Sequence, residues 1–278
     1  MARILSGRLW SPCCAEQTSS TSTKRLTRTY SEKSSTARAA LARKNHEGCD
    51  PIARMLRSEV DSDEPAPSVE DGIAFCKRLF DWSVEQCAEA GVALYSLGNA
   101  AILDAATSEI VAVMREWHLV GRERSMLEIG CGIGRFQRAL AADALSITGI
   151  DVSRNMIAAA RERCAGLANA SLLQCSGRDL TQFTTDSFDL VFAVDSFPYL
   201  FQSGMALVEE HFSEVARVLK PRGDFLTLEF SYRSELRADR TDVARLAAAA
   251  GFEVLVDGAQ PFSLRDGAAF HLRARGPR

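Results

Sequence analysis

The stretch Ser125–Arg135 reads Ser-Met-Leu-Glu-Ile-Gly-Cys-Gly-Ile-Gly-Arg and decides the fold of the chain. Its apolar residues at positions 126, 127 and 129 form a short run of the kind that becomes a buried parallel strand. Glycines follow at positions 130, 132 and 134, where a backbone without Cβ can turn sharply and let a ligand approach. Residues 135–140 then read as the opening of a helix. Strand, glycine turn and helix, in this order, predict the first unit of a nucleotide-binding α/β sheet.

The glycine spacing separates this turn from a pyrophosphate-binding loop. Such a loop needs G-x-G-x-x-G, but the third position is Arg135 when counted from Gly130 and Gln137 when counted from Gly132. The glycines follow G-x-G-x-G, and Glu128 lies two residues before the first. This pattern resembles motif I of the class I S-adenosylmethionine-dependent methyltransferases. A carboxylate beside the turn suits a ligand with a positive sulfonium and ammonium and would repel a pyrophosphate.

Composition is that of an ordinary globular protein. The chain has 278 residues, of which 46% are hydrophobic and 25% charged, and a net charge of −3, which favours neither nucleic acid nor an anionic membrane as a partner. The longest apolar stretch, Leu246–Val256, is too short to span a bilayer. The eight cysteines form no C-x-x-C pair, which predicts free thiols in a reducing compartment. No cluster of His, Asp or Glu predicts a catalytic metal.

Residues 1–66 differ in composition from the rest of the chain. Up to residue 45 they contain nine Lys or Arg but only two acids, together with many Ser and Thr. Two interpretations stay open: a disordered tail of a cytoplasmic protein, which we favour, and a transit segment that directs the protein to the mitochondrial matrix. The acidic, proline-bearing segment Asp61–Pro67 then reads as a linker.

Residues 67–120 are predicted to form a helical cap. Ser68 is expected to cap a helix whose apolar positions recur from Ile73 to Cys87, and a second helix is expected from about Ala100 to Trp117. Tyr95 lies between them. It is either a packing tyrosine or a residue that reaches the cofactor or the methyl acceptor.

Residues 121–278 alternate strands with helices. Strands are expected at 126–130, 146–151, 171–176, 188–194, 224–230, 252–256 and 269–273. Helices are expected at 135–142, after Ser153, through Val208 to Leu219 with a stop at Pro221 and Gly223, and at 241–250. This order predicts an α/β fold with a Rossmann-like, doubly wound, mostly parallel seven-stranded sheet. The final strands, joined only by a loop, resemble the methyltransferase version, whose last strand is antiparallel.

Residues at the strand ends are the candidate ligands of a cofactor, because open α/β sheets bind ligands at the carboxyl ends of their strands. Asp151 ends the second strand, where a carboxylate accepts hydrogen bonds from both ribose hydroxyls of an adenosine. Its alternative role is a helix cap, which Ser153 can also fill. Val152 and Met156 are placed to press on an adenine ring, and Met156 suits the core equally.

The resemblance extends the set of cofactor residues. It implies that Asp179 binds the adenine amino group next to a backbone N–H at Leu180, although Asp179 also suits a turn. It implies that a carbonyl near Ala193 binds the cofactor's ammonium, and Asp195 follows as a residue for the ammonium or the acceptor. The S-adenosylmethionine site implied as a whole comprises Glu128, Gly130, Cys131, Gly132, Gly134, Asp151, Val152, Met156, Asp179, Leu180, Ala193 and Asp195.

A general base is not fixed by the sequence, and the catalytic residue remains open. Tyr199 has the best placement, just beyond the fourth strand, and Glu229 alternates with apolar residues on the fifth strand. Tyr232 is a further option. His211 is expected to be a surface histidine on a helix, which makes it the weaker choice.

The leading functional hypothesis is methyl transfer from S-adenosylmethionine to oxygen or nitrogen, with carbon as a further option, of a small-molecule acceptor. The alternatives are an NAD(P)-dependent oxidoreductase, which the missing third glycine disfavours, and a non-catalytic scaffold that keeps the fold. A nucleic-acid substrate is disfavoured because no basic patch with interleaved aromatic residues follows residue 121.

Overall fold

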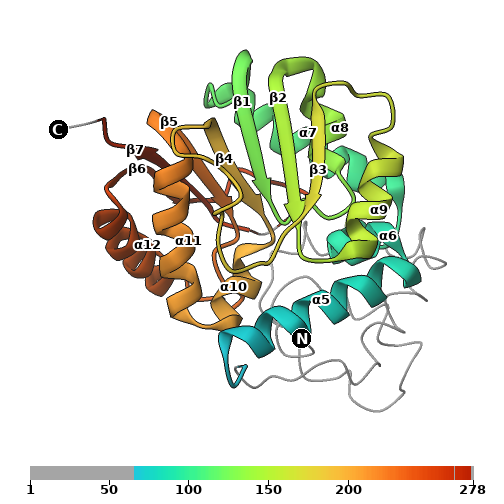
Figure 1. Ribbon diagram of the computed structural model, residues 1–278, viewed down its shortest axis with the longest axis horizontal. Coiled ribbons are helices and arrows are strands. Elements are labelled where there is room, and N and C mark those ends of the chain that lie inside the picture. Colours follow the sequence, from blue (N-terminus) through green and yellow to red (C-terminus); the bar gives the residue numbers. More distant parts are fainter. Residues whose placement is uncertain (1–65, 266, 277–278) are drawn as a thin grey trace.

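The structure is a computed structural model that describes residues 66–265 and 267–276 (Figure 1). The predictions of a disordered tail or a transit segment fall on residues 1–65 and lie outside the described residues. Within the described part, no helix is long and apolar enough to cross a membrane.

A seven-stranded sheet forms the centre of the molecule, as the alternating pattern predicts. Its strand order is β3-β2-β1-β4-β5-β7-β6, and β7 runs antiparallel to both of its neighbours. The order reverses between β1 and β4, which is where doubly wound sheets bind ligands. The strands are β1 Gly121–Ile129, β2 Ala144–Asp151, β3 Ala170–Gln174, β4 Phe188–Val194, β5 Leu219–Leu228, β6 Phe252–Ala259 and β7 Ala269–Ala274.

Helices cover both faces of this sheet. Side chains alternate along β1, so that Met126 packs with α7 and α8 while Leu127 packs in the cluster formed with α11 and α12. The helices are α5 Val69–Gln86, α6 Ala88–Val92, α7 Ala100–Glu116, α8 Arg135–Leu140, α9 Arg154–Arg163, α10 Phe197–Ser203, α11 Met205–Val218 and α12 Leu236–Ala250, with short 3₁₀ turns η1 Leu94–Ser96 and η2 Ala141–Asp143.

The helix α5 lies across the end of the sheet to which the strand arrows point (Figure 1). Its N-cap is Ser68, as expected, whose hydroxyl accepts a hydrogen bond from the N–H of Asp71. Asp81 joins it to α9, accepting hydrogen bonds from Ser153 Oγ at 2.6 Å and from the N–H of Asn155 at 3.1 Å. The cap is therefore attached to the segment that follows Asp151.

Several element bounds differ from the prediction by a few residues, and one helix was not predicted. The helix α11 ends at Val218, and β5 begins at Leu219, so that Pro221 and Gly223 lie inside the strand rather than stopping the helix. The helix α10 was not predicted, because residues 195–199 read as a loop after β4. Pro198 lies in the first turn of α10, where its missing N–H costs no hydrogen bond.

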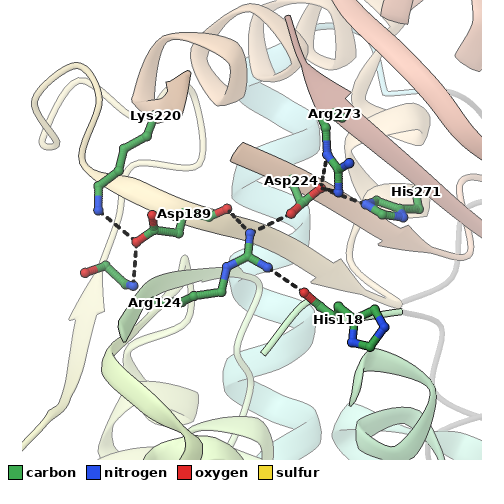
Figure 2. A network of polar contacts seen from close by, with 8 residues as sticks. His118, Arg124, Asp189, Lys220, Asp224, His271 and Arg273 are labelled. Atoms are coloured by element: carbon green, nitrogen blue, oxygen red, sulfur yellow. Dashed lines mark hydrogen bonds and ion pairs between the residues drawn. The ribbon is translucent and has the colours of Figure 1, made fainter. Parts of the chain in front are cut away.

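A polar network fixes the amino-terminal half of β5 to its neighbours (Figure 2). Asp224 is buried and accepts hydrogen bonds from Arg124 at 2.5 Å, His271 at 2.9 Å and Arg273 at 2.9 Å. Arg124 precedes the central part of β1, while His271 and Arg273 lie on β7. The three donors hold the pKa of Asp224 at about 2, below its usual value, against the opposing effect of burial.

Candidate active site

A cavity of about 360 Å³ lies at the carboxyl ends of the strands, under α5 and α6. Its walls come from the cap, from the glycine turn and from the segments that follow β2, β4 and β5. Most of the residues proposed from the sequence line it: Gly130, Gly132, Asp151, Val152, Met156, Asp179, Asp195, Tyr199, His211 and Glu229, and also Tyr95 and Tyr232. The fold therefore brings segments that are far apart in the sequence to one site.

The glycine turn is shaped by contacts that exclude side chains. Gly130 and Gly132 have φ values of +75° and +51°, which other residues rarely adopt. A Cβ on Gly130 would lie 2.4 Å from the Cβ of Ser196, and one on Gly132 would lie 2.4 Å from Cγ1 of Val92. The turn thus brings bare backbone to the cavity wall.

Asp151 is attached to the turn by its own carboxylate. Its Oδ2 accepts a hydrogen bond from the N–H of Gly132 at 3.0 Å, and its Oδ1 accepts one from Ser153 at 2.9 Å. Burial raises the pKa of Asp151 to about 6, although these N–H groups act to lower it. Each carboxylate oxygen has a second lone pair, so the pair can still accept hydrogen bonds from a ligand in the cavity.

Asp151 does not replace Ser153 as the helix cap. Ser153 Oγ accepts a hydrogen bond from the N–H of Met156 and is the N-cap of α9. Met156 is buried, packs with Leu103 and Ile133, and also lines the cavity. Met156 is thus both a core residue and a residue of the cavity wall.

Five of the residues implied by the resemblance lie behind the cavity wall: Glu128, Cys131, Gly134, Leu180 and Ala193. Glu128 is buried on the α8 side of the sheet, where its Oε2 accepts a hydrogen bond from Gln137 at 2.8 Å, and burial raises its pKa to about 8. The N–H of Leu180 donates to Glu214. These two groups therefore have partners within the protein.

Asp195 is the centre of a buried chain of charges. Its Oδ1 accepts a hydrogen bond from Arg265 at 2.6 Å, and its Oδ2 lies 3.5 Å from Nη2 of Arg135. Arg135 in turn donates to the hydroxyl of Tyr95 at 2.9 Å. Tyr95 therefore belongs to the site through this arginine, and we call these four residues the arginine chain.

Neither arginine of this chain was identified from the sequence. Arg135 was recognised as the start of a helix, and Arg265 lies in the connection between β6 and β7, which read as a plain loop. Arg135 had a usable signal, because it directly follows the glycine turn. Arg265 had none, since a lone arginine in a loop is ordinarily a solvated surface residue.

His211 is buried rather than exposed, so the expectation of a surface histidine was wrong. Its ring lines the cavity, and its Nδ1 lies 2.9 Å from the carbonyl of Leu207. Burial lowers its pKa, and therefore the ring is neutral at pH 7. When Nδ1 carries the proton for that carbonyl, Nε2 keeps a lone pair.

The tyrosines at the site pack against each other. The rings of Tyr199 and Tyr232 meet edge to face with centroids 5.7 Å apart, and Phe80 of the cap packs on Tyr199 at 4.8 Å. Burial raises the pKa of Tyr232, so its hydroxyl stays protonated at neutral pH. This part of the cavity is thus largely aromatic.

Metal chemistry has no matching ligand set in the described ranges, where no group of three His, Cys, Asp or Glu side chains is placed to hold an ion. The described cysteines are all free thiols. Cys76 and Cys175 both line the cavity. Burial raises the pKa of each to about 12, so they are poor nucleophiles.

Comparison with known proteins identifies a family model and named relatives. Residues 127–227 match the model of a methyltransferase domain. The chain is 30% identical over 162 residues to the demethylmenaquinone methyltransferase of Tropheryma whipplei (strain Twist), covering 54% of this chain and 65% of that protein. It is 30% identical over 120 residues to 24-methylenesterol C-methyltransferase 2 of Oryza sativa subsp. japonica, covering 42% of this chain and 32% of that protein. The chain thus spans less than two thirds of the length of either relative.

A solved structure shares the fold. Phosphoethanolamine N-methyltransferase 1 of Haemonchus contortus, in complex with phosphoethanolamine and S-adenosylhomocysteine, aligns with a TM-score of 0.60 at 18% identity, over 76% of this chain and 50% of that one. The predicted fold class is confirmed, including the antiparallel β7. These relatives do not favour an oxidoreductase or a non-catalytic scaffold.

Proposed function

We propose that this chain, which contains a class I S-adenosylmethionine-dependent methyltransferase domain, transfers a methyl group from S-adenosylmethionine to an oxygen, nitrogen or carbon atom of a small-molecule acceptor. One observation carries the proposal: Gly130 and Gly132 of the glycine turn line a single cavity at the carboxyl ends of β1, β2 and β4, together with Asp151, Asp195 and Arg265. Bound there, the cofactor supplies an electrophilic methyl group on a sulfonium, with a neutral thioether as leaving group.

The nucleoside half of the cofactor fits the side of the cavity near β2. Gly130 and Gly132 place bare backbone on the cavity wall, because a Cβ on either glycine would collide with Ser196 or Val92. The remaining lone pairs of Asp151 would accept the two ribose hydroxyls. Val152 would pack on the adenine ring, and Asp179 would accept a hydrogen bond from the adenine amino group.

The acceptor is placed by the rest of the cavity wall. Positioning a nucleophile in line with the methyl group can lower the barrier by roughly 7–11 kcal/mol. Phe80, Tyr199 and Tyr232 offer aromatic surfaces to an apolar acceptor, and α5 forms one wall of the cavity beside them. Where the nucleophile must lose a proton, the neutral ring of His211 is the base that we favour, because Nε2 keeps a lone pair. Tyr199 and Glu229 are the alternatives.

The compartment belongs to the same proposal. We favour a cytoplasmic protein with a solvated N-terminal segment and keep the mitochondrial matrix as the alternative. Sequencing the N-terminus of the protein from its native host distinguishes them, because a transit segment is removed on import.

Binding of S-adenosylhomocysteine, measured by calorimetry, tests the proposed function. We expect the full chain to bind it and Asp151→Ala to bind at least about tenfold more weakly, since hydrogen bonds to a charged group are lost. Glu209→Ala, an exposed acid on α11, is the matched control and should bind like the parent. Failure of the parent to bind at millimolar concentration refutes the proposal.

A further inference from the structure

Arg265 is a buried cation whose hydrogen-bonding capacity is only partly used. Its side chain is 2% exposed, in the connection between β6 and β7, and it lines the cavity. Its Nη2 donates to Asp195, and its guanidinium lies over the ring of Phe262 at 5.3 Å. Within the described part of the chain, its Nε and Nη1 have no hydrogen-bond partner.

Unpaired donors on a buried cation are costly. A buried polar group without a partner costs about 1–3 kcal/mol, and more when it is charged. Arginine cannot relieve this cost by losing its proton. The neighbouring carboxylate is also shared, because Asp195 pairs with Arg135 as well as with Arg265. An acceptor arriving through the cavity would remove this cost.

The position of Arg265 in the sheet separates it from the nucleoside side. Asp151 ends β2, whereas Arg265 leads into β7, which lies beyond β1, β4 and β5 in the strand order. The guanidinium of Arg265 meets Asp195 at the end of β4, which is two strand spacings from β2, about 10 Å. The ionisable groups that act on Arg265 are Asp195, Tyr95, Glu229 and Tyr232. Arg265 thus faces the part of the cavity that the acceptor occupies.

We propose that Arg265 binds an anionic group of the methyl acceptor, a carboxylate or a phosphate, so that the substrates of this protein are anionic molecules with an apolar or aromatic body. The inference rests on the proposed function. An oxyanion accepts charge-assisted hydrogen bonds from a guanidinium, and the aromatic rings of Tyr199 and Tyr232 cover the remainder of the molecule. Asp195, which is itself paired with Arg135, holds Arg265 in place.

Binding of small probes tests this proposal. The full chain is saturated with S-adenosylhomocysteine, and the affinities of phenylacetate, phenyl phosphate and the neutral phenylacetamide are measured by calorimetry. We expect one of the anions to bind at least about tenfold more tightly than the amide. Arg265→Met should abolish this preference, and Arg265→Lys should keep part of it because the charge remains. Arg245→Met, on an exposed arginine of α12, should leave it unchanged.

A second arm identifies the source of the anion. The cofactor also carries a carboxylate, whereas 5′-methylthioadenosine lacks the whole amino-acid end. If Arg265→Met weakens the binding of S-adenosylhomocysteine but not that of 5′-methylthioadenosine, Arg265 binds the carboxylate of the cofactor and the proposal is overturned. Absence of any anion preference in the parent overturns it too, even though the parent binds S-adenosylhomocysteine. Failure of the parent to bind S-adenosylhomocysteine instead refutes the proposed function.

Discussion

Asp151 accepts two backbone hydrogen bonds before any ligand arrives, from Gly132 and Ser153. The same carboxylate therefore fixes the glycine turn and presents its remaining lone pairs to the cavity. Burial, with the charge of Asp81 adding to it, raises the pKa of Asp151 to about 6, although the two N–H groups act to lower it. Ligand binding that needs the ionised form must then depend on pH in the neutral range.

We expect the affinity for S-adenosylhomocysteine to be constant above pH 7 and to fall about tenfold by pH 5, as the carboxyl of Asp151 takes up a proton. Asp151→Asn should bind more weakly and show no step near pH 6. Calorimetry from pH 5 to 8 measures both profiles. A step near pH 6 that persists in Asp151→Asn would assign the titration to another group.

Glu128 provides a prediction about stability. Burial raises its pKa to about 8, so the folded chain holds a proton that the unfolded chain releases near pH 4.5. The free energy of unfolding should therefore decrease as pH rises from 6 to 8, by up to about 1.4 kcal/mol per pH unit. Asp151, with its pKa of about 6, contributes in the same direction mainly below this window.

Glu128→Gln should remove that decrease and should be more stable than the parent at pH 8, because a neutral amide can keep a hydrogen bond with Gln137. Urea unfolding at pH 6, 7 and 8 measures the change. Glu123→Gln, at an exposed position of β1, is the control and should follow the parent. Equal pH slopes for parent and Glu128→Gln would show that Glu128 is ionised in the folded protein.

At the scale of elements, Asp81 links the cap to the sheet. It accepts hydrogen bonds from Ser153 Oγ and from the N–H of Asn155. Both donors lie close in the chain to Asp151, whose carboxylate binds the glycine turn. Asp81→Ala should lower the free energy of unfolding by about 1–2 kcal/mol. It should also weaken the binding of S-adenosylhomocysteine, because α5 forms one wall of the cavity.

Glu85→Ala is the matched control for Asp81→Ala. Glu85 lies one turn further along α5 and pairs with Asn155 at the surface, so its loss should cost less than about 0.5 kcal/mol. Thermal unfolding and calorimetry measure both variants. If Asp81→Ala destabilises the chain without lowering its affinity for S-adenosylhomocysteine, the cap supports the fold but does not shape the cavity.

The elements were predictable where local pattern and burial agree. The apolar run of β4 was predicted with its observed bounds, Phe188–Val194, because a strand covered on both faces is apolar at every position except Asp189. Leu219 was assigned to a helix because its spacing from Val215 is helical, yet pairing with Phe188 places it in β5. Such a boundary depends on a strand partner that sequence periodicity does not contain.

The site residues that directly follow a strand could be predicted from the sequence, whereas those on α11 and in the β6–β7 connection could not. Asp151 and Asp195 follow from their positions after β2 and β4, since the carboxyl edge of a parallel sheet gathers such residues. The burial of His211 and Arg265 depends on how α11 and the β6–β7 connection pack over that edge. This packing is a tertiary property, which a single helix face or a loop does not reveal.

The whole molecule has a different kind of polar chemistry at each end of its sheet. The carboxyl ends carry unpaired donors and a cavity, whereas the network around Asp224 further back along β5 pairs its charges fully across three strands (Figure 2). Because His271 and Arg273 lie on β7, this network ties the antiparallel strand to the parallel sheet. Its contribution should appear in global stability and not in ligand binding.

Asp224→Asn should lower the free energy of unfolding by about 3 kcal/mol at pH 7, because removing the buried carboxylate leaves the partly buried Arg124 and Arg273 without their partner. The pKa of Asp224 is about 2 when folded, below its value of 3.8 when unfolded. Its stabilisation, about 2 kcal/mol by this difference, is complete above pH 4 and is lost as pH falls towards 2.

Guanidinium unfolding from pH 2 to 7 tests this assignment. The parent should lose stability between pH 4 and 2, and Asp224→Asn should lose about 2 kcal/mol less over the same range. Asp143→Asn, which breaks a pair with Arg115 at the surface, should change stability by less than about 1 kcal/mol. Affinity for S-adenosylhomocysteine at pH 7 should be the same in both variants as in the parent. A loss of affinity in Asp224→Asn would mean that the register of β5 and β7 positions the cavity as well as stabilising the sheet.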